Sequence, residues 1–565
     1  MAKKGSYVIG IDFGTLSGRA LLVDISNGET VQAAAMDYPH GVMTEQLPDG
    51  RRLPPNSAVQ DPGDYLTVLA HIVPEAVRES SVRPEEILGI GIDFTGCTLV
   101  STDRSGKPLC FYPEYADQPL AWAIHWKHHG GAAYAEPVNK TVERRRPELL
   151  PRHGGRISAE MMLPKVLQIV REAPEIYAAA DLILEAGDWM TMQLTGKLVR
   201  SRAMAGYKAF WQKEAGFPDK EFYRELDPAL EDIVETRLRG ELRGLGEPVG
   251  GLLPKMAKRL GLKPGTVVAV AQYDSHAALP GAGIYAPGKA LLTLGTSGGF
   301  LLAYDKECAV EGITGMTEDG NLPGYYGYAS GQCCLGDMFA WYADNLTPEV
   351  YQRSAREAGK PIQTFLMEKA QEKKPGENGL LALDWWAGNR SVLADHHLSG
   401  LVLGMTLQTK PEDIYRALLE SAAFGTRRIL QSYQQAGISV GEIYAVGGIV
   451  CKNPLLMQIY ADVLDRPIHT CRTNQAAALG SAIFAAAAVG EERGGYRTVP
   501  EAIRRMAGAE DTGYKPIPEN REIYQRLYQE YEQLHDYFGR GTNQVMARLK
   551  QLCFREANVR KEDQK

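Results

Sequence analysis

The chain has 565 residues, of which 44% are hydrophobic and 23% charged, and its formal net charge is −7. This length exceeds one ordinary hydrophobic core and predicts two or three domains, and the composition is typical of a globular protein. Its 62 basic and 69 acidic side chains leave no positive excess that would attract nucleic acid. We therefore expect no nucleic-acid partner.

Eight cysteines are scattered along the chain without the paired spacing of a metal site, so we expect reduced thiols. The first ten residues lead directly into an apolar strand, which leaves no room for a signal peptide. No apolar run reaches the ~20 residues that span a bilayer. The sequence thus predicts a cytoplasmic protein with no membrane partner.

The first chemical signal is residues 8–24, VIGIDFGTLSGRALLVD. An apolar strand ends at Asp12, turns through Gly14 and Thr15, and resumes as a second strand. Glycine allows the backbone to approach a ligand, while the Asp12 carboxylate and the hydroxyls of Thr15 and Ser17 suit a metal and phosphate. Hairpins with glycine turns are common, so this motif alone indicates nucleotide binding only weakly.

A similar unit recurs in the second half of the chain. Residues 290–304, ALLTLGTSGGFLLAY, run from a strand through Gly295, Thr296 and Ser297 into another strand. Residues 87–102, ILGIGIDFTGCTLVST, also break at an acidic, glycine and hydroxyl cluster. These repeats predict an internal duplication and a cleft between two related lobes that could hold a nucleoside triphosphate.

Strands and helices alternate in the first lobe, with strands expected at 7–11, 20–24, 87–93, 99–102 and 267–271. Between 110 and 240 the pattern is more helical, which suggests an insertion. The glycine and proline cluster at 280–288 predicts a domain boundary and hinge.

Two helices are expected in the second half of the chain. One begins after Thr409, which stands at capping-box spacing from Glu412. The other is an amphipathic helix in the tail, docked on the body through the stripe Tyr524, Leu527, Tyr528, Tyr531, Leu534 and Phe538.

The ordered segments DFGT (12–15), DWMTMQLTG (188–196), YDSHAALPGAG (273–283), GTSG (295–298) and GGIVCKNPLLMQIYADVL (447–464) resemble the FGGY carbohydrate kinases. That family lies within the actin, hexokinase and heat-shock chaperone superfamily. Three further segments, YKAFW (207–211), SGQCCLGDMFAW (330–341) and WWAGNRSVLADHHLSGLVLGMTLQT (386–409), resemble the branch that phosphorylates the ketopentose L-ribulose. The resemblance covers residues 7–540.

The resemblance implies an α/β fold with two ribonuclease-H-like, actin-like ATPase lobes and a ligand cleft between them. The expected domains are a sugar-binding lobe at 1–285 with a helical insertion at about 110–240, a nucleotide-binding lobe at 286–495, and a helical tail at 496–565. The implied reaction is ATP-dependent phosphorylation of L-ribulose to L-ribulose 5-phosphate in L-arabinose catabolism, with ATP and Mg²⁺ as cofactors. A homodimer is left open.

Asp274 follows the apolar run TVVAVAQY, so we expect it at the end of a strand that faces the cleft. From the residues alone it could be a general base or a helix N-cap; the resemblance implies the base. Asp12 is the implied Mg²⁺ ligand. Thr15, Ser17 and Arg19 would meet the terminal phosphates, although Arg19 could instead pair with a surface carboxylate.

The nucleotide residues implied in the second lobe are Gly295, Thr296 and Ser297 for the phosphates, Gly447, Gly448 and Asn453 around the adenosine, and Gly336 and Ala340 on the adenine side. The sugar residues implied in the first lobe are Gly96, Cys97 and Lys208, together with Asp274. Lys208 could contact sugar oxygens or extend from an aromatic patch.

One position departs from the pattern of the family. Relatives in the ribulose branch carry an acidic residue in the segment that corresponds to GYASGQ, where this chain has Ala329 and Ser330. Ala329 is therefore a sugar-site position without the carboxylate that would accept a hydrogen bond from a sugar hydroxyl. This difference leaves open an engineered substitution or a different sugar.

Three alternatives remain at this point. The nearest is an FGGY kinase for xylulose, another ketose or a polyol. An actin-like or chaperone-type ATPase would need a peptide-binding domain or a polymer surface, and the short tail predicts neither. A sugar-sensing repressor would need an N-terminal DNA-binding helix-turn-helix, for which the sequence leaves no room before the first strand.

Overall fold

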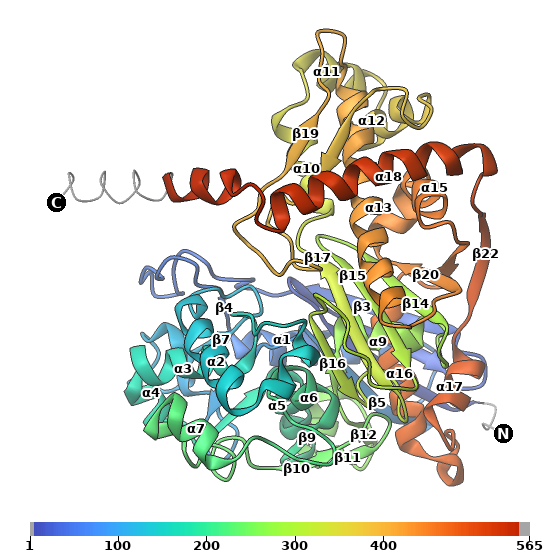
Figure 1. Ribbon diagram of the computed structural model, residues 1–565. Coiled ribbons are helices and arrows are strands. Elements are labelled where there is room, and N and C mark those ends of the chain that lie inside the picture. Colours follow the sequence, from blue (N-terminus) through green and yellow to red (C-terminus); the bar gives the residue numbers. More distant parts are fainter. Residues whose placement is uncertain (1–4, 553–565) are drawn as a thin grey trace.

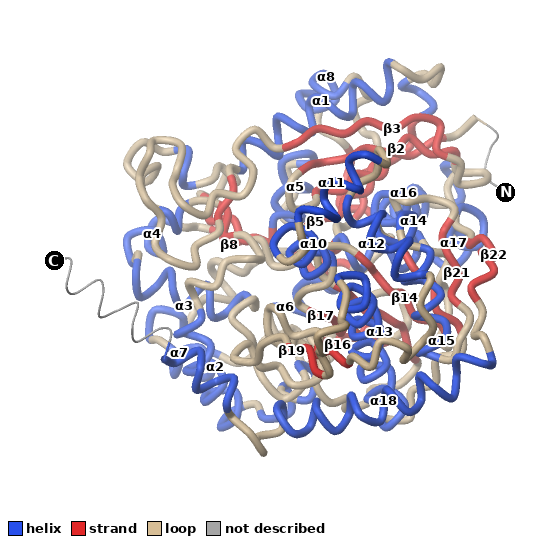
Figure 2. Tube along the Cα trace, turned by 90° about the horizontal axis from the view of Figure 1, so that it is seen from above, coloured by secondary structure: helices blue, strands red, loops and turns tan. Residues whose placement is uncertain are grey.

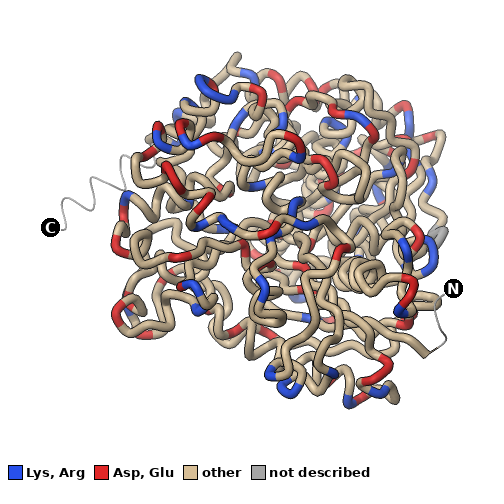
Figure 3. Tube along the Cα trace, turned by 90° about the horizontal axis from the view of Figure 1, so that it is seen from below, with Lys and Arg blue, Asp and Glu red and all other residues tan. Residues whose placement is uncertain are grey.

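The computed structural model describes residues 5–552, with the backbone alone for residues 509–512. Two lobes, each built around a seven-stranded sheet, lie side by side, and helices cover the sheets (Figures 1 and 2). Lysine and arginine are interspersed with aspartate and glutamate along the described chain (Figure 3). None of the described helices is both long and apolar enough to cross a membrane.

The sheet of the first lobe has the following strands in spatial order: β11 (Pro248–Gly251), β12 (Val267–Ala269), β5 (Ile87–Phe94), β1 (Tyr7–Phe13), β2 (Ser17–Asp24) and β3 (Thr30–Asp37), with β13 (Gln272–Tyr273) also paired to β5. β1 is antiparallel to β2 and parallel to β5. The strand expected at 267–271 ends at Ala269, and the chain then pairs again with β5 through a second short strand, β13, that lies just beyond the expected range.

The sheet of the second lobe repeats this pattern. Its strands are, in spatial order, β16 (Gly315–Glu318), β17 (Tyr326–Gln332), β15 (Gly298–Tyr304), β14 (Lys289–Leu294), β20 (Glu442–Val446), β21 (Ile468–Cys471) and β22 (Ala509–Tyr514). β14 is antiparallel to β15 and parallel to β20, as β1 is to β2 and β5. The predicted duplication is present in the strand order.

Residues between about 110 and 240 are mainly helical. The helices of the first lobe are α1 (Pro62–Arg78), α2 (Ala132–Arg145), α3 (Met162–Glu172), α4 (Pro174–Ala179), α5 (Ala186–Thr195), α6 (Arg202–Lys208), α7 (Lys220–Leu226), α8 (Pro254–Leu260) and α9 (Asp274–Gly281). Two small sheets accompany them: β4 (Val59–Gln60), β7 (Ala123–Ile124), β6 (Leu99–Thr102) and β8 (Leu182–Glu185) in one, and β9 (Val199–Ser201) with β10 (Glu241–Arg243) in the other.

The second lobe carries the remaining helices and one two-stranded sheet, β18 (Leu381–Leu383) with β19 (Leu401–Leu403). The helices are α10 (Gly336–Asn345), α11 (Glu349–Glu357), α12 (Ile362–Gln371), α13 (Pro411–Gln435), α14 (Gly448–Lys452), α15 (Pro454–Leu464), α16 (Ala476–Val489), α17 (Val499–Met506) and α18 (Pro518–Gly539). As predicted, the tail helix α18 docks on the body, with Tyr524, Tyr528 and Tyr531 fully buried.

The expected capping box at Thr409 and Glu412 is wrong by one position. α13 begins at Pro411, its N-cap is Lys410, and the Asp413 carboxylate accepts a hydrogen bond from the Lys410 N–H at 2.9 Å. Proline is preorganised for the first helical position, which moves the cap to the residue before it.

Two helices join the lobes. α16 lies between β21 and β22 of the second sheet in sequence but packs on β1 and β5 of the first, and it crosses α9. Glycines allow this approach: a Cβ atom on Gly10 or Gly91 would lie 1.8 Å from a carbonyl oxygen of α16. At the crossing, a Cβ atom on Gly480 would lie 1.7 Å from the Ala277 carbonyl oxygen. The lobes are therefore joined by backbone-to-backbone packing that larger residues would prevent.

Gly480→Ala should destabilise the protein, although glycine to alanine in an exposed helix normally stabilises by about 1 kcal/mol. Overpacking at the crossing should cost ~1–3 kcal/mol and lower the melting temperature. The matched control is Gly441→Ala, because the nearest atom to its Cβ would be 3.7 Å away. An unchanged or raised melting temperature for Gly480→Ala would show that the crossing is not tightly packed.

Candidate functional site

Three aspartates meet where the two lobes join. Asp12 and Asp93 are register partners at the ends of the parallel strands β1 and β5, and both are buried. Asp274 directly follows β13, the strand that pairs with the end of β5. The carboxyl ends of these strands lie at one edge of the sheet, as is typical of ligand sites in α/β folds.

The electrostatics of this group favour a neutral or partly neutralised carboxyl. Burial, followed by the charge of Asp12, raises the pKa of Asp274 to about 7. Burial and the charge of Asp12 also raise the pKa of Asp93. Like charges close together in a buried site disfavour ionisation, and a pKa near 7 suits a general base at neutral pH.

The residues present fit a divalent cation held by oxygen ligands. Asp12 and Asp93 offer carboxylate oxygens at neighbouring strand ends, and among the described residues Oδ1 of Asp93 has no hydrogen-bond partner, whereas its Oδ2 accepts from Ser481 at 2.7 Å. Hard oxygen ligands with retained water are what Mg²⁺ prefers. Asp12 also pairs with Arg19 at 2.9 Å; because Asp12 is buried, it is not the surface carboxylate that the sequence left open as a partner for this arginine.

The two predicted turns that contain glycine and hydroxyl residues, at 14–17 and 295–297, are both hairpin loops. Gly14 N donates to Ser17 O at 3.1 Å in the first turn, and Gly295 N donates to Ser297 O at 3.1 Å in the second. In the first turn, Thr15 is held from a distant segment, because Trp126 Nε1 donates to its hydroxyl at 3.2 Å.

The helix α10 docks on the second turn, since Leu335 N donates to Thr296 O at 2.9 Å and Gly336 N to Gly295 O at 3.0 Å. Gly336 therefore contacts the Gly295 turn, and Ala340 lies one helical turn further along α10, half-buried. A Cβ atom on Gly336 would lie 2.7 Å from the Gly295 carbonyl oxygen, so the close approach requires glycine.

The double glycine follows β20. Gly447 has φ 114°, and a Cβ atom there would lie 2.3 Å from the Leu294 carbonyl oxygen, whereas a Cβ atom on Gly448 would meet nothing within 4 Å. Gly448 therefore has open space in front of it. Asn453 caps α15 with its Oδ1, which accepts from Leu456 N at 2.9 Å, so a ligand contact from this side chain would come from its amide nitrogen.

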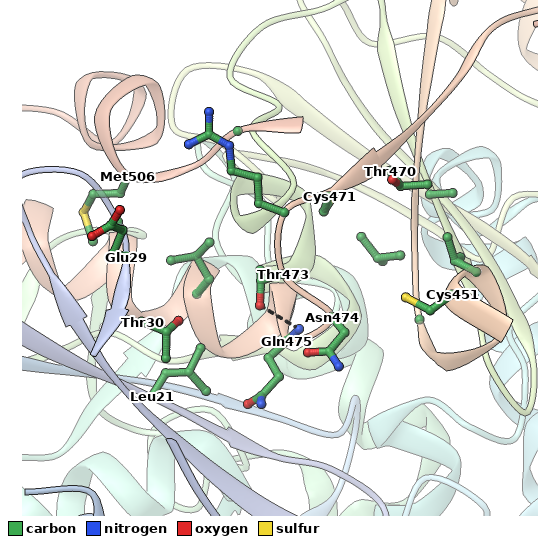
Figure 4. Close-up of a pocket in the computed structure, with 18 of the residues that line it drawn as sticks. Leu21, Glu29, Thr30, Cys451, Thr470, Cys471, Thr473, Asn474, Gln475 and Met506 are labelled. Atoms are coloured by element: carbon green, nitrogen blue, oxygen red, sulfur yellow. Dashed lines mark hydrogen bonds between the residues drawn. The ribbon is translucent and has the colours of Figure 1, made fainter. Parts of the chain in front are cut away.

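A cavity of about 790 Å³ adjoins Gly447 (Figure 4). Leu21 of β2, Thr30 of β3 and Glu29 just before β3 line it from the first lobe, and Cys451 and the segment 470–475 line it from the second. This volume is within the range of ~300–1,000 Å³ of small-molecule sites. Among the predicted nucleotide residues, Gly447 is the one that lines it; neither phosphate turn does.

The predicted sugar residues lie around a buried cluster of charges in the first lobe. Cys97 is buried with φ 62°, and its carbonyl oxygen accepts from Lys165 Nζ at 2.6 Å. Lys208 ends α6, and its charge acts on Cys97 and Glu185. A Cβ atom on Gly96 would lie 3.6 Å from the ring of Tyr273.

Ala329 is a buried residue of β17. It belongs to the apolar cluster that contains Tyr207 and Tyr273, so its methyl group points toward the first lobe, whereas the neighbouring Ser330 bonds Tyr433 behind the sheet. The position thus faces the lobe where the sugar is expected, with an apolar side chain.

Sequence reasoning missed two acidic residues of this region. Asp93 lies in the tetrapeptide GIDF (91–94), which repeats GIDF (10–13), and this identity could have revealed it. Glu185 ends β8 and accepts a hydrogen bond from Tyr273 at 2.8 Å. Burial raises the pKa of Glu185 to about 7. No signal in the local sequence distinguishes Glu185 from a surface glutamate.

The chain matches the FGGY family of carbohydrate kinases, with the N-terminal domain at residues 7–281 and the C-terminal domain at 290–489. A ribulokinase of Geobacillus thermodenitrificans is 50% identical over 551 residues, 97% of each chain. A ribulokinase of Mycolicibacterium smegmatis is 45% identical over 546 residues, 96% of each chain.

Solved structures share the fold. A ligand-bound xylulose kinase from Lactobacillus acidophilus has a TM-score of 0.77 at 19% identity, covering 94% of this chain and 98% of that one. Plasmodium falciparum glycerol kinase with ADP has a TM-score of 0.71 at 20% identity, also covering 94% and 98%. The two-lobed α/β architecture of these kinases is therefore the fold of this chain.

Asp274→Asn should raise the melting temperature at pH 8 by a few degrees. A carboxyl whose folded pKa is raised from 3.8 to about 7 makes the protein less stable as pH increases through that interval, and asparagine removes this effect. Below about pH 4 the two proteins should melt alike. Asp305→Asn, at an exposed position, is the control. A lower melting temperature for Asp274→Asn at pH 8 would contradict the electrostatic picture.

Proposed function

The chain belongs to the FGGY family of carbohydrate kinases, and we propose that it transfers the γ-phosphoryl group of ATP to L-ribulose, forming L-ribulose 5-phosphate and ADP. The observation that carries the choice of sugar is the likeness to ribulokinases at 45–50% identity over nearly the whole chain. This reaction would serve L-arabinose catabolism.

Asp274 is the proposed general base. In this mechanism its carboxylate accepts the proton of the attacking sugar hydroxyl while the new O–P bond forms and the bond between the γ-phosphorus and the bridging oxygen breaks, which releases ADP. The pKa near 7 supports the role, because a base with that pKa is both available and strong enough at neutral pH. Its position where the two lobes join also supports the role, because there it would lie between a sugar on the first lobe and a nucleotide on the second.

The two turns would hold the phosphates from opposite sides. Thr15, Ser17 and Arg19 lie on the first lobe and Gly295, Thr296 and Ser297 on the second, so their backbone N–H and hydroxyl groups can stabilise charge that spreads over the phosphate oxygens. Asp12 would hold Mg²⁺, directly or through water, and the bound ion supplies charge neutralisation on the phosphates.

The nucleoside would lie along Gly447, Gly448, Asn453, Gly336 and Ala340. Two features support this placement. Gly448 has open space in front of its backbone, and the docking of α10 brings Gly336 beside the Gly295 turn, so the planar adenine ring could approach the backbone at both glycines.

Gly96, Cys97 and Lys208 would contact the sugar. We place the sugar lobe at 1–285, the nucleotide lobe at 286–495 and the tail at 496–565; a cytoplasmic location and a homodimer remain predictions.

The proposal is tested by measuring ADP release with ATP and Mg²⁺ for a panel of ketopentoses, ketohexoses and polyols. L-Ribulose should give the highest kcat/KM. Chelation of the metal should abolish turnover and its return should restore it. If a polyol or xylulose is clearly preferred, the choice of sugar is wrong and the family assignment stands.

Asp274→Asn should lower kcat by roughly 10²- to 10⁴-fold, the usual contribution of a positioned general base. The KM for ATP should change little. In the wild type, kcat/KM should fall below about pH 7 as Asp274 takes up a proton. Near-normal turnover of the folded variant would remove Asp274 from the chemistry.

Ala329→Glu should lower the KM for the preferred sugar by roughly tenfold, since a charge-assisted hydrogen bond contributes about 1.5–3 kcal/mol. The KM for ATP should stay the same, because the nucleotide binds the other face. Ala329→Gln is the matched control for size without charge. A uniform loss for every sugar, in a protein that still folds, would mean that position 329 serves packing alone.

A further inference from the structure

The segment 386–409 was prominent in the sequence, yet none of the catalytic roles above uses it. Its first half is an irregular loop between β18 and β19 that is anchored to the second lobe. Gly331 N of β17 donates to Ser391 Oγ at 3.1 Å, and the backbones of Asn389 and Asp395 bond each other at 2.9 and 2.8 Å. Arg390 therefore projects from a fixed loop.

Arg390 reaches across to the first lobe. Its Nη2 donates to Glu160 Oε1 at 3.2 Å, although 230 positions separate the two residues. Both side chains are mostly buried, at 21% and 17% exposure, and Nε of Arg390 has no partner among the described residues. A pair this enclosed is costly to break, since either charge would be left without its counterion.

On the second lobe, Arg390 lies close to the segment that supports the proposed phosphate turn at Gly295. Its guanidinium lies near enough to Cys333 for its positive charge to act on that thiol. Two residues beyond Cys333, Leu335 N and then Gly336 N donate to the carbonyl oxygens of Thr296 and Gly295. The guanidinium therefore lies beside the end of β17, next to the segment that supports the Gly295 turn.

On the first lobe, Glu160 connects to the sugar residues. It lies two positions before α3, and Lys165 of α3 donates to the carbonyl oxygen of Cys97 at 2.6 Å. Burial tends to raise the pKa of Glu160, but the charges of Arg390 and then Lys208 outweigh it and lower the pKa to about 2. Glu160 is thus an anion that contacts Arg390 and whose charge also interacts with that of Lys208.

We propose that Arg390 and Glu160 form a positioning pair, which aligns the Gly96–Cys97 turn and Lys208 for the sugar when the two lobes come together. Neither residue takes part in the chemistry. Arg390 fixes Glu160, which fixes the start of α3 and the charge beside Lys208. The inference rests on the proposed function, because it assigns these residues to a sugar site.

The chain offers a matched control. Arg152 and Glu307 form another ion pair between the same lobes, with Nε to Oε1 at 3.0 Å and Nη2 to Oε2 at 2.7 Å. The Glu307 side chain is 42% exposed, and neither residue is linked to Cys97 or to a phosphate turn through the contacts described above. If ion pairs only hold the lobes together, loss of either pair should have the same effect.

The experiment compares Arg390→Gln, Glu160→Gln, the double variant and Arg152→Gln. For Arg390→Gln and Glu160→Gln we expect the KM for the preferred sugar to rise and kcat/KM to fall by roughly 10- to 100-fold, as for a small misplacement of a binding group. The affinity for ATP measured without sugar should stay within about threefold. The double variant should lose little more than either single one, because paired residues are not additive.

A charge exchange keeps the test valid if the single variants are unstable. Glu160→Arg combined with Arg390→Glu should recover at least part of kcat/KM relative to either change alone, and melting temperatures are measured throughout. The proposal is overturned if Arg390→Gln stays within about twofold of wild type, or if Arg152→Gln loses as much. It is also overturned if Arg390→Gln weakens ATP while Glu160→Gln has no effect, which would make Arg390 a phosphate ligand.

Failure of the positioning pair can be distinguished from failure of the proposed choice of sugar. If the panel selects a sugar other than L-ribulose, the variants are assayed with that sugar, and the proposed function fails while the positioning pair is still tested. If L-ribulose is confirmed and the variants behave like Arg152→Gln, the pair fails alone.

Discussion

The crossing of α9 and α16 sets the geometry of the whole molecule. Each helix belongs to one lobe by sequence and packs against the other, and Gly281 and Gly480 bring the two backbones together where they cross. α9 begins with Asp274, so the residue proposed as base is attached to this joint. A change in the crossing angle would therefore move Asp274 relative to both phosphate turns, which connects the fold directly to the site.

Near the same helix crossing, the fold brings the carboxyl groups of Asp12 and Asp93 close together. Asp12 and Asp93 are paired by strand register, and α16 supplies Ser481, which bonds one oxygen of Asp93. Such an arrangement opposes folding as the carboxyls ionise, and proteins retain such groups mainly where they have a function. Cation and phosphate binding would relieve this repulsion, so ligand binding and lobe stability should be coupled.

The duplicated sheets, the tail helix and the strand-end position of Asp274 were predictable because they depend on local patterns. The α13 cap was wrong by one residue because Pro411 favours the first helical position more strongly than the capping pattern indicates. Asp93 was missed although its GIDF segment repeats that of Asp12, since register appears only when strands pair. The pair Glu160 and Arg390 could not be predicted, because nothing local indicates which of many charged residues meet after folding.

The tail helix α18 has a consequence for how the protein is made. Tyr531 donates to Asp384 Oδ1 at 2.8 Å, and Gln332 donates to the other oxygen of this buried carboxylate at 2.7 Å. Tyr524 likewise bonds both Arg416 and Glu420, a buried ion pair of α13. These tyrosines are synthesised only near the end of translation. Until then, Asp384 and the ion pair of α13 lack some of their hydrogen-bond partners, although most of the chain has already left the ribosome. The second lobe therefore completes its folding last, and an mRNA truncated shortly before the codon for residue 518 would yield a lobe whose buried charges lack these hydrogen bonds.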